Sequence, residues 1–190
     1  NIKINFYIDN KHAAEMVIEK AWLGNDRFSF GATSTATITT EDCVEEPNAS
    51  LDRITLSDMG FSGEETIHSG VTSEDTKRGI VGSFVGKEIV FYATFGNYRY
   101  FSFGNQGEVY QGVVARLQPN GTDFKFYHDK DTSNAKTVTY TAAEHFGAGT
   151  DKKFEGQKLL FRITIEYADA SQENIKINFY IDNKHAAEMV

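Results

Sequence analysis

Side chains that could perform chemistry are present but scattered along the sequence. The five histidines lie far apart, and no two have the spacing of zinc ligands; they are His12, His68, His128, His145 and His185. The fingerprints of serine hydrolases, phosphate-binding loops and dinucleotide-binding folds are absent. Acidic residues are numerous, but a sequence does not show whether two carboxylates lie at the separation that glycoside hydrolysis requires. We therefore expect no enzyme activity, no cofactor and no metal, with a glycoside hydrolase on a jelly-roll sandwich as the less favoured alternative.

Cys43 is the single cysteine of the chain, so an intrachain disulfide is excluded. It follows Asp42 in an acidic stretch, and negative neighbours disfavour the thiolate that a nucleophile requires. We expect an inert thiol.

An aromatic run between residues 91 and 103 is the best candidate for ligand binding. If Phe91, Phe101 and Phe103 fill the core, the alternation of side chains along a strand places the neighbouring tyrosines on a surface. Exposed tyrosines stack on sugar rings, and adjacent polar groups bind the sugar hydroxyls. The alternative is that these rings only pack across strands. The candidate ligand-binding residues are Tyr92, Asn97, Tyr98, Arg99 and Tyr100.

Composition limits the class of protein. The chain has 190 residues, of which 40% are hydrophobic and 24% charged, as expected for one globular domain with a core. Its net charge of −8 and the absence of a basic stripe argue against nucleic-acid binding. No apolar run is long enough to cross a bilayer, so we expect a protein that does not span a membrane. A mature secreted protein whose signal has been removed fits this composition, and so does a cytosolic protein.

The sequence predicts that strands position the candidate residues described above. Fifteen Phe, nine Tyr and only two Pro favour strands joined by tight turns. The dipeptides Gly86–Lys87 and Gly96–Asn97 predict two-residue hairpin turns, and Pro119–Gly121 predicts a further turn. The spacing of strands without helices between them predicts an antiparallel sandwich. The clearest predicted strands are 80–85, 88–95, 98–103, 108–117, 122–128, 137–141 and 157–167.

One segment occurs twice. Residues 1–17, the first copy, and residues 174–190, the second copy, are identical letter for letter. Repeats that stack into a solenoid recur several times and drift, so we interpret the second copy as an appended, engineered tail. Each copy alternates apolar and polar residues, which places four large apolar side chains on one face of an extended strand. These are Ile2, Ile4, Phe6 and Ile8 in the first copy and Ile175, Ile177, Phe179 and Ile181 in the second.

With this alternating amino-terminal segment, a body of short strands and a final strand, Leu159–Tyr167, that ends in tyrosine, the chain resembles a chaperone–usher pilus subunit. The resemblance implies an all-β, immunoglobulin-like antiparallel sandwich that lacks its last strand and receives it from the neighbouring subunit. A second copy appended at the carboxyl end resembles a self-complemented form of such a subunit. Because the chain contains a single cysteine, the resemblance is closer to the disulfide-free alternative branches of the family.

The resemblance also implies a division of the chain and a function. The divisions are an extension at 1–12, a sandwich at 13–167, a linker at 168–173 and a donor strand at 174–190. The implied function is a structural or adhesive subunit of an extracellular fimbrium, which polymerises head to tail by donor-strand exchange. Its implied partners are neighbouring subunits, a periplasmic chaperone, an outer-membrane usher, and a host glycan or protein receptor. The alternative, from another class, is a carbohydrate-binding module or tip adhesin that uses the tyrosine-rich face.

Overall fold

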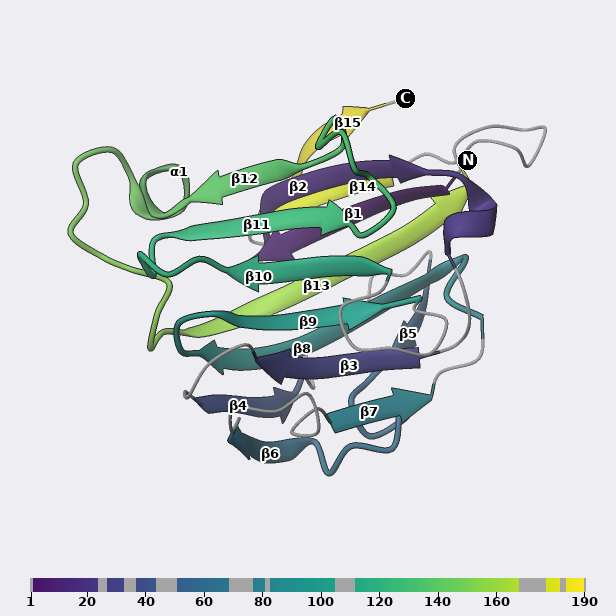
Figure 1. Cartoon of the computed structure of the whole chain (residues 1–190), viewed down its shortest axis with the longest axis horizontal. Coiled ribbons are helices and arrows are strands. Elements are labelled where there is room, and N and C mark those ends of the chain that lie inside the picture. The colour runs from purple at the N-terminus through teal and green to yellow at the C-terminus, as the bar shows by residue number, and fades with distance from the viewer. Residues whose placement is uncertain are drawn as a thin grey trace.

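Two antiparallel sheets pack face to face, and a separate hairpin lies beside them (Figure 1). This computed structural model describes residues 2–23, 27–32, 37–43, 51–68, 77–80, 83–104, 112–167, 177–181 and 184–189. The predicted all-β antiparallel sandwich is confirmed. The predicted linker at 168–173 and the residue Ile175 lie outside the described residues.

The first sheet holds the amino-terminal strand in its interior. Its order is β2 (Lys11–Ile18), β1 (Ile2–Ile8), β13 (Lys158–Tyr167), β8 (Lys87–Phe95), β4 (Thr37–Asp42) and β6 (Glu64–His68). A short strand, β5 (Asp52–Ile54), pairs with β8 in parallel.

The second sheet covers the inner face of the first. Its order is β12 (Val138–Thr141), β11 (Asp123–His128), β10 (Val113–Leu117), β9 (Arg99–Phe103), β3 (Arg27–Ala32) and β7 (Lys77–Ile80). Two short helices, the 3-10 helix η1 (Lys20–Trp22) and α1 (Ala142–Phe146), follow β2 and β12. The separate hairpin consists of β14 (Ile177–Ile181) and β15 (Lys184–Met189).

Aromatic rings from both sheets fill the space between them. Phe91 of β8 faces Phe101 of β9 with ring centroids 5.4 Å apart and contacts Phe30 of β3 at 5.2 Å. Edge-to-face pairs of this kind contribute beyond the area that they bury. The predicted inward positions Phe91, Phe101 and Phe103 are therefore confirmed as core residues.

The two predicted glycine hairpins around β8 are wrong. β7 and β9 both belong to the second sheet, whereas β8 lies in the first, so the chain crosses between sheets at both turns. At the second crossing, Tyr98 adopts a positive φ of 58°. Crossing places the apolar faces of β8 and β9 opposite each other across the core, which a hairpin within one sheet cannot do. The turn at Pro119–Gly121 does join a hairpin, in which Leu117 pairs with Phe124.

Candidate strand-exchange site

Strand β1 occupies a site between β13 and β2, which we call the β1 site. It is antiparallel to both neighbours, and its register with β13 runs from Ile2 opposite Tyr167 to Ile8 opposite Phe161. Its hairpin with β2 has a register shift between Phe6 and Tyr7. Because β1 pairs along both edges, its removal would expose two strand edges of the first sheet.

The inward face of β1 supplies part of the core. Ile2, Ile4, Phe6 and Ile8 are between 0% and 1% exposed. The ring of Phe6 lies 4.5 Å from that of Phe126 and about 6 Å from those of Phe101 and Phe103. Complete burial of such side chains contributes roughly 1.5–3 kcal/mol each, an upper bound because unfolded chains already bury some surface. The predicted apolar face of the first copy is confirmed.

The outward face of β1 carries the polar residues Lys3 and Asn5 and the ring of Tyr7, and it is also buried. Lys3 Nζ lies 3.0 Å from Glu15 Oε2 of β2, and Asn5 Nδ2 donates to Thr164 Oγ1 of β13 over 3.4 Å. Lys3 and Asn5 are at most 1% exposed. A segment must therefore cover this face.

The separate hairpin lies where such a cover is needed. β14 contacts β1, β2 and β13 but pairs with β15 and not with these strands. A strand that contacts three neighbouring strands without joining their sheet crosses a face of that sheet. The inner face is occupied by the second sheet, so β14 lies against the outer face, beside β1 and β2 in Figure 1.

The second copy repeats the hairpin of the first. Ile177 pairs with Met189 as Ile4 pairs with Met16, and the register shift falls between Phe179 and Tyr180 as it does at the equivalent residues of β1. The resemblance to a self-complemented subunit predicts that the second copy, through Ile175, Ile177, Phe179 and Ile181, completes the first sheet. The structure instead has the first copy in that position. The two-residue turn between β1 and β2 closes at a lower entropic cost than the longer connection from β13 to the second copy.

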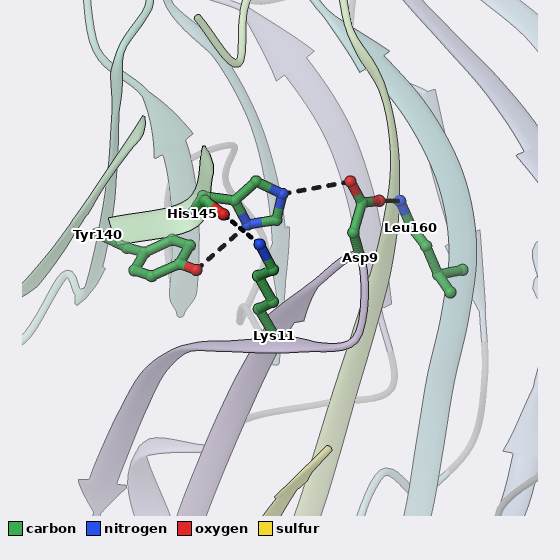
Figure 2. Close-up of polar contacts among 5 residues, drawn as sticks. All are labelled: Asp9, Lys11, Tyr140, His145 and Leu160. Atoms are coloured by element: carbon green, nitrogen blue, oxygen red, sulfur yellow. Dashed lines mark hydrogen bonds and ion pairs between the residues drawn. The ribbon is translucent and has the colours of Figure 1, made fainter. Parts of the chain in front are cut away.

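A set of polar contacts, which we call the turn clamp, holds the turn of the first copy (Figure 2). Asp9 and Asn10 have φ values of 48° and 59°, as a two-residue hairpin turn requires. Asp9 Oδ1 accepts from Leu160 N over 2.6 Å, and Asp9 N donates to Leu160 O over 2.6 Å. Lys11 Nζ donates to the carbonyl oxygen of His145. The turn is thus anchored to β13 and to α1.

His145 connects the turn to a buried tyrosine. Its Nε2 lies 3.2 Å from Asp9 Oδ2, and its Nδ1 lies 3.2 Å from the hydroxyl of Tyr140. Burial raises the pKa of the Tyr140 hydroxyl, and the carboxylates of Glu144 and Asp9 raise it further, so the tyrosine remains protonated. In a neutral imidazole that donates from Nε2 to Asp9, Nδ1 is the acceptor for this hydroxyl.

Helix α1 is fixed at the point where it presents His145. The side chain of Thr141 accepts from Glu144 N, and the Glu144 side chain accepts from Thr141 N, which is a capping box. His145 is 2% exposed and packs against Phe154 with ring centroids 5.3 Å apart. The imidazole is therefore held by α1 and Phe154 as well as by the turn.

The predicted ligand-binding face does not form. Tyr92 lies in the first sheet, whereas Arg99 and Tyr100 lie in the second and are both 0% exposed. Tyr98 is 38% exposed and lies with the half-buried Asn97 in the segment that connects β8 to β9. The expectation that the tyrosines share one surface is wrong, because the chain crosses between sheets at residues 96–98. Burial also lowers the pKa of Arg99 to about 10.

The other candidates for chemistry are dispersed. Cys43 is buried against Val90 and Leu160. Within the described part of the chain, no three histidine, cysteine or acidic side chains are grouped so as to hold a metal ion. None of the helices in that part is long and apolar enough to cross a membrane.

The sequence does not predict the turn clamp. Asp9 is separated from His145 and Leu160 by more than 130 positions, so no local spacing connects them. The only available signal was that both copies contain an Asp-Asn dipeptide, which accepts two positive φ angles.

Comparison with known proteins gave no relative. No family model, no curated protein and no solved structure matches this chain.

Proposed function

We propose that this chain is a structural and adhesive subunit that polymerises head to tail by donor-strand exchange and forms a pilus-like fibre on the cell surface. The observation that supports this proposal most is the presence of two identical hairpin sequences and one β1 site. The first copy fills the site of its own chain, and the second pairs only with itself among the described residues. Either copy has the residues needed to fill the β1 site of another molecule. Because we interpret the second copy as an engineered tail, the amino-terminal copy is the proposed donor in the parent subunit, and the second copy serves to test whether the site accepts a strand from another molecule.

Such an exchange produces an open assembly. Each molecule offers a hairpin at one position and a site at another, so the contact is heterologous and repeats from molecule to molecule. Every exchange replaces the inward residues of the strand in the β1 site by identical residues from a neighbouring molecule. The packing of the core is therefore preserved, and the neighbouring subunits become linked.

The resemblance to chaperone–usher subunits supplies the remaining partners of the proposal. A periplasmic chaperone would cover the β1 site before assembly, and an outer-membrane usher would direct the exchange. A host glycan or protein receptor is the proposed adhesive target, although the buried Arg99 and Tyr100 do not favour the tyrosine face for this role.

Disulfide trapping tests the proposal. Asn5 and Thr164 are cross-strand partners, and their side chains meet at 3.4 Å, close enough for a disulfide between cysteines at these positions. In a Cys43→Ser background, Thr164→Cys with Asn5→Cys should give a cross-linked monomer. Thr164→Cys with Asn178→Cys should give a ladder of covalent oligomers after partial unfolding and refolding at high protein concentration.

The second pair of cysteines has two contrary outcomes. A cross-linked monomer alone would show that the second copy enters the site of its own chain, which contradicts polymerisation. No cross-link at all would show that the site does not accept the second copy, and this result contradicts the proposal as a whole.

A further inference from the structure

We propose that Tyr140, His145 and the main chain of Leu160 form a recognition site for the Asp-Asn-Lys turn of the hairpin that occupies the β1 site. Its second ligand is the turn of the second copy, Asp182–Lys184, supplied by another molecule of this chain. Only this second ligand rests on the proposed function, because the contacts to the first copy are present in the structure.

Leu160 and His145 contact three groups of the turn. The carboxylate of Asp9 is held at both oxygens, by Leu160 N at 2.6 Å and by His145 Nε2 at 3.2 Å. The backbone of Asp9 donates to Leu160 O, and Lys11 donates to the carbonyl oxygen of His145. The site therefore recognises three groups of the turn: the carboxylate of Asp9, the backbone N–H of Asp9 and the ammonium group of Lys11.

The turn clamp fixes the register of β1, which the apolar face alone does not. Ile2, Ile4, Phe6 and Ile8 alternate with polar residues, so a slip of β1 by two residues would still point large apolar side chains into the core. Such a slip moves the turn by about 6.6 Å along the strand, because each residue adds about 3.3 Å. Asp9 would then be out of reach of both Leu160 N and His145. The clamp therefore fixes the register of the hairpin.

The second copy has the same ligand groups. Asp182, Asn183 and Lys184 are the equivalents of Asp9, Asn10 and Lys11, and this tripeptide occurs nowhere else in the sequence. A hairpin that enters the β1 site in the native register would bring these groups to His145 and Leu160. The clamp thereby selects the second copy over other alternating strands.

The first arm of the test compares two glycine variants in the full chain. Asp9→Gly removes the clamped side chain, and Asn10→Gly is the matched control, because both positions have positive φ and Asn10 Oδ1 has no hydrogen-bond partner. We expect Asp9→Gly to lower the equilibrium constant for folding by about tenfold or more relative to Asn10→Gly. This difference should shrink in a His145→Phe background. Tyr140→Phe, which keeps the ring, serves as a second background if His145→Phe does not fold. Equal effects of Asp9→Gly and Asn10→Gly would overturn the proposal.

The second arm measures selection between the copies. A Cys43→Ser chain with Asn5→Cys, Thr164→Cys and Asn178→Cys lets position 164 form a disulfide with whichever copy lies beside it, and peptide mapping gives the ratio. We expect Asp9→Gly to shift this ratio about tenfold towards position 178, and Asp182→Gly to shift it the other way. The two substitutions together should restore the original ratio.

The two arms separate the failure of the clamp from the failure of exchange. If a 164–178 disulfide forms between molecules but the ratio does not depend on Asp9 or Asp182, the recognition site is refuted and exchange stands. If no 164–178 disulfide forms between molecules in any variant, the second ligand and the proposed function are refuted together. The first arm then still decides whether the clamp recognises the first copy.

Discussion

If the second copy can replace the first in the β1 site, which we call interchange, substitution of Phe6 will change the free energy of unfolding in a characteristic way. The ring of Phe6 is fully buried and contacts Phe126, Phe101 and Phe103. Truncation of a buried phenylalanine to alanine costs about 3–5 kcal/mol through lost transfer energy and the cavity that remains. In a chain with one copy, Phe6→Ala would show this full cost.

A second identical copy lowers that cost. When Phe6→Ala weakens the first copy, the second can take the β1 site through the connection 168–174 in place of the two-residue turn. The longer connection adds about 1 kcal/mol of closure entropy, from (3/2)RT ln n with about seven residues against about two. The packing of β14 on the outer face is given up as well. We therefore expect Phe6→Ala alone to cost about 1–2 kcal/mol.

The matched variants complete a double-mutant cycle. Phe179→Ala alone should change stability by less than about 0.5 kcal/mol, because Phe179 is not needed while the first copy holds the site. Phe6→Ala with Phe179→Ala should cost the full 3–5 kcal/mol, so that the two effects are strongly non-additive. Urea unfolding followed by the fluorescence of Trp22, the single tryptophan, gives the three free energies. A cost of 3–5 kcal/mol for Phe6→Ala alone, unchanged by Phe179→Ala, would refute interchange.

Three further predictions concern charge and assembly. Phe179→Asp should leave the unfolding free energy within about 0.5 kcal/mol of the parent but abolish the covalent ladder of the Asn178→Cys pair, because a charge would enter an apolar site; a persisting ladder contradicts this. Glu88 is fully buried, with Arg53 at 2.9 Å and Arg162 at 3.5 Å, so Glu88→Ala should cost about 3–5 kcal/mol in urea unfolding, and a cost below 1 kcal/mol would show that the arginines are not left uncompensated. Burial, aided by the charge of Lys3, lowers the pKa of His12 to about 4, so the folded state binds fewer protons than the unfolded state between pH 6.5 and 4 and loses stability as pH falls through that window. Since the imidazole is partly exposed, we expect His12→Phe to remove roughly 2 kcal/mol of this pH dependence; identical slopes for both proteins would contradict the assignment.

The sequence predicted the elements better than their arrangement. The alternation in residues 2–8 correctly identified which side chains enter the core, because a period of two leaves only one choice of face. The strands at 122–128 and 137–141 and the final strand were located within one or two residues. These are local properties, set by side-chain type and by turn residues.

Crossings between sheets were not predictable in this way. Gly96 and Asn97 fit a hairpin turn as well as they fit a crossing, and the choice depends on how Phe91 and Phe101 meet across the core. Which of the two copies occupies the β1 site could not be predicted either, because identical sequences have identical strand propensities. Only the length of the connection to the neighbouring strand distinguishes them, and that requires knowledge of which strands are neighbours.

The mixed character of the face beneath β14, with Lys3 and Asn5 beside the ring of Tyr7, has a consequence for how readily the tail can leave. Uncovering the ring of Tyr7 would expose hydrocarbon to water and hold the tail back. Lys3, Glu15 and Asn5 instead regain hydration when β14 departs, which offsets part of the packing energy that its departure removes. The second hairpin therefore lies on a face where hydration of the polar groups favours its release and exposure of Tyr7 opposes it.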